Sequence, residues 1–222
     1  CMKKGRFVER GIWLFLLACG ILTVGILDTA FTQDNEPDAS QKYRIRIRKI
    51  YGTGSAGTVK TPLYSTSVPR STGAPDEWGQ ITVEYDVAVA NRNDPWINEL
   101  LFEYFVITDK GNNQLSFFKK SVRYADVKEG QGHMSRVYLR PAAIERFGKV
   151  VAAAVEISAE GKVLAEDSDV TMKQLKSVPK WWRVKEVVDS EMLSKRGEGY
   201  LINRMESPFA YINVDDFEVI KE

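Results

Sequence analysis

The sequence predicts a mainly β protein, with an N-terminal membrane anchor, an antiparallel β-sandwich and a C-terminal α+β extension. Seven segments between residues 43 and 165 have strand-like patterns. Most of them are separated by short turns, and a helical turn is expected in only one of the connections. An uncharged apolar run precedes these segments, and a stretch of mixed pattern follows them. With 222 residues and 44% hydrophobic content, the chain is large enough to bury a substantial core.

The apolar run covers residues 11–27, close to the shortest length that spans a bilayer. Basic residues precede it and acidic residues follow it, and residues 32–222 are nearly neutral, with 27 basic and 28 acidic residues. The positive-inside rule then places the N-terminus in the cytoplasm and the folded body in the periplasm or outside the cell. We therefore expect inner-membrane lipid around residues 11–27, and no nucleic-acid partner.

Three kinds of anchor fit residues 1–31, and all three give the same topology. The run can be an uncleaved signal anchor, because no clean cleavage site follows it. Leu16–Cys19 resembles a lipobox, in which Cys19 would be lipidated. Lys3-Lys4-Gly5, with Glu9 before the apolar run, resembles the leader of type IV pilins, in which the chain is cut after the glycine.

The body is expected to follow a polar linker, residues 32–42. In the first strand, Tyr43–Tyr51, isoleucines alternate strictly with arginines. Further strands are predicted at Gln80–Ala90, Leu100–Thr108, Leu115–Tyr124, Met134–Arg140, Val150–Ser158 and Lys162–Ala165. The helical turn, Pro141–Phe147, falls between the fifth and sixth strands, where immunoglobulin-like sandwiches often carry one. We therefore predict an immunoglobulin-like antiparallel sandwich over residues 43–169.

Residues 170–222 have a different pattern from the sandwich. Apolar residues recur at close to helical spacing in Trp181–Leu193, which predicts a helix. Tyr200–Ile202 and Phe209–Val214 have the pattern of short strands. We predict a helix and a small β extension that pack on the sandwich.

The arginines of the first strand form one candidate partner surface. Arg44, Arg46 and Arg48 share a face and can bind an anionic partner or phospholipid headgroups. The alternative is that they protect a sheet edge from aggregation. If the first two strands pair, Glu84 and Asp86 lie across from the arginines.

The long segment from Gly52 to Gly79 is a second candidate partner surface, with Tyr64 and Trp78 as its aromatic residues. Ordered loops of this length are uncommon and tend to be functional. A short edge strand is expected within it, around Val59–Tyr64. Its first residues match G-x-G-x-x-G, but the β-branched and proline-containing sequence that follows excludes the helix that a dinucleotide site requires.

Residue types for catalysis are sparse. His133 is the only histidine, and both cysteines, Cys1 and Cys19, precede the body. A nucleophile–histidine triad or a zinc site is therefore not expected, and we predict a protein without enzymatic activity or cofactor. Four tryptophans can stack on sugars, which leaves glycan binding open: Trp78, Trp96, Trp181 and Trp182.

The anchor, linker and cysteine-free sandwich together resemble archaeal-type pilins and the anchored, pilus-associated envelope proteins of type IV pilus systems. The segment Tyr200–Ala210 (YLINRMESPFA) is similar to a C-terminal signature of one such bacterial envelope group. The resemblance implies a non-catalytic role in pilus or fimbria assembly, with envelope or pilus proteins as partners. The alternative that we carry forward is an anchored adhesion module that binds glycan or protein.

Overall fold

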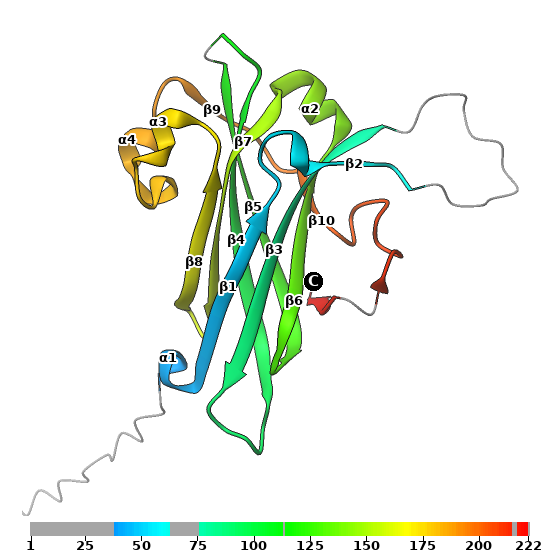
Figure 1. Cartoon of the computed structure of the whole chain (residues 1–222), viewed down its shortest axis with the longest axis vertical. Coiled ribbons are helices and arrows are strands. Elements are labelled where there is room, and N and C mark those ends of the chain that lie inside the picture. Colours follow the sequence, from blue (N-terminus) through cyan, green and yellow to red (C-terminus); the bar gives the residue numbers. More distant parts are fainter. Residues whose placement is uncertain (1–37, 63–75, 113, 215–216, 222) are drawn as a thin grey trace, which may run out of the picture. The chain divides into compact units, whose positions relative to one another are not determined.

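Two β-sheets face each other, as predicted (Figure 1). The computed structural model describes residues 38–62, 76–112, 114–214 and 217–221. One sheet has the order β1-β3-β6-β10 with β2 also on β3, and the other has the order β11-β5-β4-β7-β8 with β9 also on β5. The strands are β1 (Tyr43–Tyr51), β2 (Thr58–Lys60), β3 (Glu77–Val89), β4 (Trp96–Asp109), β5 (Leu115–Lys128), β6 (Gly130–Leu139), β7 (Lys149–Ala159), β8 (Lys162–Val170), β9 (Leu193–Lys195), β10 (Leu201–Asn203) and β11 (Val219–Lys221). The helices and 3-10 turns are α1 (Ala39–Lys42), η1 (Gly54–Gly57), α2 (Pro141–Phe147), α3 (Lys173–Lys176), η2 (Trp181–Arg183) and α4 (Lys185–Val188).

The inner faces of the two sheets form the main core. In β3, Ile81, Val83 and Tyr85 are buried, and they alternate with the more polar side chains of the outer face. In β4, consecutive residues such as Val106 and Ile107 are buried on opposite faces of the sheet. This two-sided burial explains the continuous apolar pattern of β4, because both faces of the six-stranded sheet are covered.

Hydroxyl groups are buried inside the main core. The Tyr104 hydroxyl donates to Ser135 Oγ at 2.6 Å, and the Tyr124 hydroxyl lies 2.7 Å from the same oxygen. Burial raises the pKa of Tyr124 to about 12, and it also raises the pKa of Tyr104 well above its usual value. The shared serine therefore satisfies both phenols, which would otherwise be costly to bury.

The predicted strict alternation of β1 is wrong at Arg48. A β-bulge lies between Ile47, which pairs with Tyr85, and Lys49, which pairs with Glu84. The extra residue leaves both Arg48 and Lys49 exposed and turns the next residue, Ile50, into the core.

The predicted linker extends too far, because Ala39–Lys42 already forms α1. Ala39 is buried, and Asp38 forms an ion pair with Lys162 of β8, so this segment packs on the sandwich. The rest of the linker and the predicted anchor, residues 11–27, lie outside the described residues, as do Gly5, Glu9 and Cys19. No helix in the described part of the chain is long and apolar enough to cross a membrane.

Residues 171–195, called the arm, cover the outer face of the six-stranded sheet. The predicted helix over Trp181–Leu193 is wrong, because η2 and α4 are short and the extended residue Val184 separates them. The arm and the outer face of the six-stranded sheet form a second core, in which Trp181 and Trp182 are both buried. A continuous helix would turn the second ring away from the sheet by about 100°, so tertiary packing overrides the helical pattern here.

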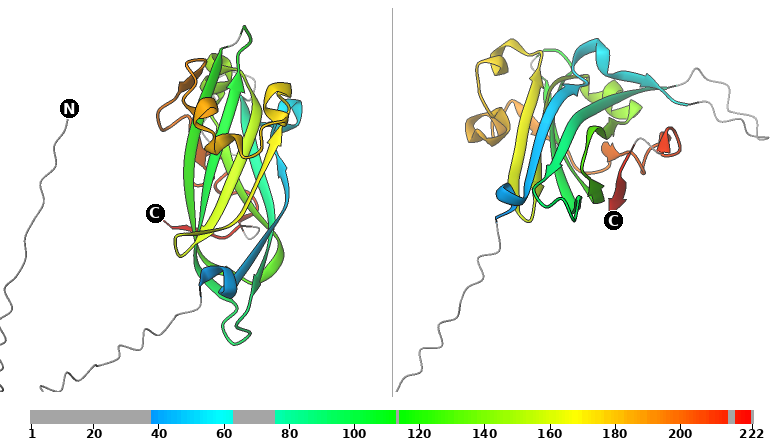
Figure 2. Two further views of the ribbon diagram at one scale, coloured as in Figure 1. Left: turned by 90° about the vertical axis from the view of Figure 1, so that its left-hand side faces the viewer. Right: turned by 60° about the horizontal axis from the view of Figure 1, so that its bottom comes forward.

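Residues 196–221, called the tail, continue to the five-stranded sheet on the opposite side of the sandwich (Figure 2). Its strand β10 pairs with β6, and Phe209 stacks on Tyr138 with ring centroids 4.5 Å apart. The predicted strand over Phe209–Val214 is wrong, because the chain turns there with a hydrogen bond from the Ile212 amide to the Phe209 carbonyl. The tail ends in β11, which pairs with β5.

Candidate functional site

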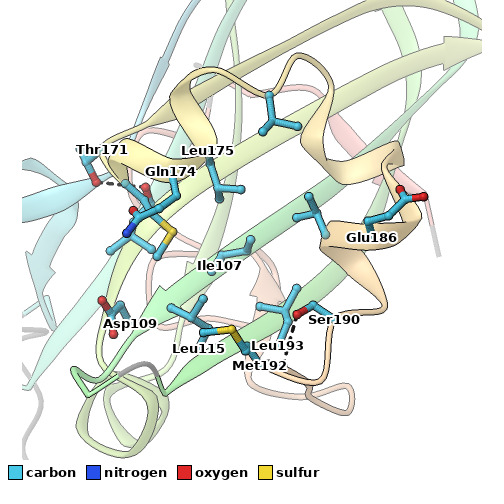
Figure 3. Close-up of a pocket in the computed structure, with 14 residues that line it drawn as sticks. Ile107, Asp109, Leu115, Thr171, Gln174, Leu175, Glu186, Ser190, Met192 and Leu193 are labelled. Atoms are coloured by element: carbon cyan, nitrogen blue, oxygen red, sulfur yellow. Dashed lines mark hydrogen bonds between the residues drawn. The ribbon is translucent and has the colours of Figure 1, made fainter.

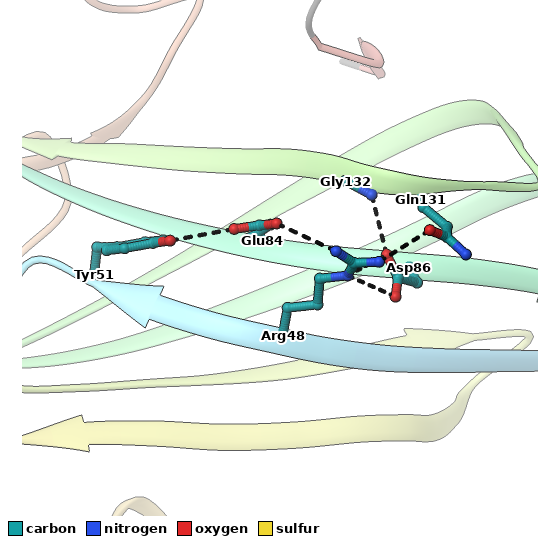
Figure 4. A network of polar contacts seen from close by, with 6 residues as sticks. All are labelled: Arg48, Tyr51, Glu84, Asp86, Gln131 and Gly132. Atoms are coloured by element: carbon teal, nitrogen blue, oxygen red, sulfur yellow. Dashed lines mark hydrogen bonds and ion pairs between the residues drawn. The ribbon is translucent and has the colours of Figure 1, made fainter.

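The outer face of the five-stranded sheet carries a polar network around Arg48 (Figure 4). The Arg48 guanidinium contacts Asp86 at 2.7 Å and donates to the Gln131 side chain at 3.1 Å. Glu84 lies 3.9 Å from Arg48 and accepts a hydrogen bond from the Tyr51 hydroxyl at 3.2 Å. The expected pairing of Glu84 and Asp86 with the arginines of β1 is therefore observed.

This network has mutually stabilising charges. The hydrogen bond from Arg48 holds the pKa of Asp86 below its usual value, although desolvation opposes this effect. The same hydrogen bond raises the pKa of Arg48. Arg48 is therefore committed to contacts within the domain, although it was predicted to belong to a partner surface.

Arg44 and Arg46 differ from Arg48. Both are exposed, and neither has an ion-pair partner among the described residues. They line an open hollow together with Asp86 and Glu129, so positive and negative charges are mixed there. Of the three arginines of β1, Arg48 thus has a structural role, whereas Arg44 and Arg46 can contact a partner.

The two aromatic residues predicted as a partner surface in the segment from Gly52 to Gly79 differ in outcome. Tyr64 lies outside the described residues. Trp78 was predicted as part of a partner surface, but it is only 8% exposed and its indole packs edge-on against Phe209. Its Nε1 donates to Thr61 Oγ1 at 3.0 Å, so the ring belongs to the core under the tail. The prediction for Trp78 is therefore wrong, because the tail covers a position that the sequence leaves at the surface.

The glycine-rich motif and His133, considered above as possible sites of chemistry, both have structural roles. After the glycine-rich turn η1 the chain continues as strand β2, as predicted, and does not open a helix. His133 Nδ1 lies 2.7 Å from Glu218 Oε1, and the imidazole stacks on Tyr85. Within the described part of the chain, no group of three or more His, Cys, Asp or Glu side chains could hold a metal ion.

A hollow between the arm and the six-stranded sheet is a candidate binding site (Figure 3). This cleft has a volume of about 520 Å³ and is open to solvent. Its floor consists of Ile107, Leu115 and Val151, at the ends of β4, β5 and β7. Apolar side chains of the arm form the wall: Met172, Leu175, Val178, Val187, Met192 and Leu193. Its size and apolar lining are those of a ligand-binding site.

Polar contacts to Glu156 and Glu166 hold the arm in place next to the cleft. Trp182 Nε1 and Arg183 Nε, from consecutive residues of η2, both donate to Glu156 Oε1 at 2.5 Å. Arg183 also contacts Glu166 at 2.8 Å. Although burial raises the pKa of Glu156, the hydrogen bonds from Arg183 and Trp182 lower it by more. An ionised Glu156 thus fixes the centre of the arm.

Each end of the arm is also attached to the sheet. Thr171 donates to the Val151 carbonyl through both its amide, at 2.9 Å, and its hydroxyl, at 3.0 Å. At the other end, β9 pairs in parallel with β5, with Leu193 opposite Leu115. The cleft is therefore preformed, because the arm is attached at its start, centre and end.

The rim of the cleft is polar and carries negative charge. Its acidic side chains are Asp109 and Glu186, and its lining includes no basic side chain. Asp109 Oδ1 accepts a hydrogen bond from the Gly111 amide at 2.7 Å, and no described residue forms an ion pair with Asp109 or Glu186. The cleft can therefore receive an apolar group that carries a positive charge.

Sequence reasoning missed this cleft. The helical spacing of the apolar residues in Trp181–Leu193 indicated a helix there and gave no sign of a cleft. Trp181 and Trp182 were considered for sugar stacking, but both are buried and hold the arm. The cleft depends on contacts between distant strands, which periodicity does not reveal.

Comparison with known proteins gives a family and a fold. A protein-family model matches residues 37–222. The chain belongs to that family. A crystal structure from Akkermansia muciniphila has 22% sequence identity and a TM-score of 0.67, and the match covers 82% of this chain and 94% of that one. At this identity the match shows that the family's sandwich fold is shared with that protein. Comparison with curated proteins gave no match.

Proposed function

We propose that this protein is a non-enzymatic, membrane-anchored interaction or structural protein of a bacterial envelope, and that it takes part in pilus-like or fimbrial assembly. The preformed apolar cleft under the arm carries the proposal, because such a surface suits binding. The lining of the cleft includes neither histidine nor cysteine, so it offers no imidazole base and no thiol nucleophile. Binding is therefore its best-supported role.

The strand order supports the finer part of the proposal, an immunoglobulin-like fold. The order β1-β3-β6 in one sheet faces β5-β4-β7-β8 in the other. Helix α2 connects β6 to β7 across the two sheets. Sandwiches of this kind are common in cell-surface proteins, where rigid sheets present binding surfaces.

The proposed location is based on the sequence of the N-terminal region. Residues 11–27 would lie in the inner membrane, with the sandwich in the periplasm or outside the cell. The mature N-terminus, determined by mass spectrometry, distinguishes the three anchors. An intact start indicates a signal anchor, an acylated Cys19 a lipoprotein, and a start at Arg6 pilin-like processing.

Affinity purification from native membranes tests the assembly role. The full chain, tagged at its C-terminus and cross-linked in the membrane, is expected to recover pilus or fimbrial components. An unrelated anchored sandwich protein, expressed at the same level, is the control for non-specific recovery. Equal recovery of pilus components by both proteins would remove the assembly role.

Trp96 favours the second candidate function, an adhesion module that binds glycans. It is 42% exposed, and Lys128 Nζ lies 5.5 Å from the centre of its ring. A glycan array with the wild-type chain and Trp96→Ala tests this role, because an exposed ring is needed for sugar stacking. Binding that Trp96→Ala abolishes would favour adhesion over assembly.

A further inference from the structure

We propose that the cleft between the arm and the six-stranded sheet binds an apolar peptide segment that carries a lysine or arginine. This inference rests on the proposed function as an interaction protein and specifies its partner. It comes from three properties of the cleft: its shape, its charge and its polar groups that lack partners.

The shape of the cleft suits a peptide. A volume of about 520 Å³ accommodates apolar side chains, yet the cleft is open along the arm. Sites for small ligands usually enclose most of the ligand surface. Met192, at the rim, is 55% exposed, and with Met172 it gives the wall flexible side chains that adjust to different partners.

Charge selects a basic residue in the partner. Asp109 reaches the cleft from the end of β4 and Glu186 from α4, so carboxylates stand on both the sheet and the arm (Figure 3). Lysines are present on α3 and α4, but none of them lines the cleft: Lys173, Lys176 and Lys185. Three other carboxylates around the arm have basic partners, namely Glu156, Glu166 and Asp189, whereas those of the cleft have none among the described residues.

Polar groups at the rim favour a peptide over an acyl chain. The side chain of Gln174 lines the cleft, is exposed, and has no hydrogen-bond partner among the described residues. An amide both donates and accepts hydrogen bonds, so it can pair with a peptide backbone. An acyl chain would leave this capacity unused.

Fluorescence anisotropy of a labelled peptide tests the proposal. The probe is a short synthetic peptide of leucine and serine residues that also carries lysine next to its leucines. The protein is the full chain in lipid nanodiscs. We expect saturable binding, and a loss when the leucines are replaced by serine. Absence of saturable binding would overturn the proposal.

The charge prediction is tested by Glu186→Lys. Because Glu186 is exposed, this change should leave the melting temperature unchanged, while it weakens binding of the lysine peptide by about tenfold. A peptide with glutamate in place of lysine should show the opposite preference and regain affinity for the variant. Glu191→Lys is the matched control, because it makes the same charge change on an exposed residue of the arm outside the cleft.

Two further outcomes would refute the proposal. In the first, Glu186→Lys and Glu191→Lys have equal effects. In the second, dodecyltrimethylammonium binds with the expected charge dependence and the peptide does not, which makes the cleft a site for amphiphiles. If Glu186→Lys loses the peptide but still recovers the same envelope proteins from membranes as the wild type does, the assembly role stands and uses another surface. If the peptide binds as expected but no envelope protein is recovered, the proposed function fails by itself.

Discussion

The outer faces of the two sheets are stabilised in opposite ways. Near β1, the five-stranded sheet presents a network of charged side chains that pair with one another in contact with water, centred on Arg48 and Asp86. The six-stranded sheet presents apolar side chains that the arm must cover, with Trp181 at 0% exposure. Apolar burial contributes more free energy than exposed ion pairs do. The covered face therefore holds the architecture together, and its incomplete cover creates the cleft.

The largest expected effect comes from Trp181→Ala, which would remove the main apolar contact of the arm. We expect the free energy of unfolding to fall by about 3–5 kcal/mol, because a fully buried aromatic ring leaves a cavity. Urea denaturation followed by circular dichroism measures this change. Met192→Ala, at an exposed position on the same arm, is the control and should have little effect. Similar losses in the two variants would contradict the conclusion that burial of Trp181 holds the arm on the sheet.

Alkaline pH should destabilise the main core between the two sheets, because Tyr124 is buried there. Tyr124 has a pKa of about 12 in the folded protein, above the usual value near 10 for an unfolded chain. The unfolded state therefore loses its proton first, and the stability conferred by burial is complete below pH 10 and declines from there to pH 12. The expected loss is up to about 2.7 kcal/mol.

Chemical denaturation at pH 9, 10, 11 and 12 measures this loss, with absorbance near 295 nm to follow phenolate formation. Tyr124→Phe should have a shallower pH dependence than the wild type. An identical slope in the two proteins would show that Tyr124 does not ionise on unfolding as proposed.

Glu156→Gln tests the anchor at the centre of the arm. It removes the charge that accepts hydrogen bonds from Trp182 and Arg183, so we expect a loss of about 1.5 kcal/mol. Because the pKa of Glu156 is lowered in the folded state, its contribution is present at neutral pH and disappears as the pH falls through the folded pKa. Thermal unfolding should show a larger difference between variant and wild type at pH 7 than at pH 3.

Arg48→Ala should have the smallest effect, because the network around Arg48 is exposed to water. The melting temperature should fall less than in Glu156→Gln, and the difference from wild type should shrink as salt is added. Melting curves at low and high ionic strength measure this. A loss as large as that of Trp181→Ala would reverse the comparison between the two faces.

The sequence predicted those parts of the fold that depend on local periodicity. The alternation in β3 and the continuous apolar run in β4 each follow from which faces are buried, and both are found in the structure. The bulge at Arg48 was not predicted, because pairing between β1 and β3 determines it. The helix expected over Trp181–Leu193 is absent for a similar reason, since two adjacent tryptophans enter one core.

The candidate sites were harder to predict than the fold. The ladder of arginines was identified, but its division into a paired Arg48 and unpaired Arg44 and Arg46 depends on the bulge. Trp78 appeared to be a surface residue because the Phe209 that covers it lies far along the chain. The cleft could not be predicted, because its floor and wall come from segments that meet only in the folded protein.

The tail has a consequence for biosynthesis. Strands β9 and β11 pair with β5, and β10 pairs with β6, so residues near the C-terminus close two strands that are complete by Leu139. At ordinary elongation rates, translating residues 171–222 takes on the order of several seconds after the sandwich strands have been made. During that time the edges of β5 and β6 are open to pairing with other chains. The nascent protein therefore depends on β9, β10 and β11, or on a chaperone, to protect these edges from aggregation.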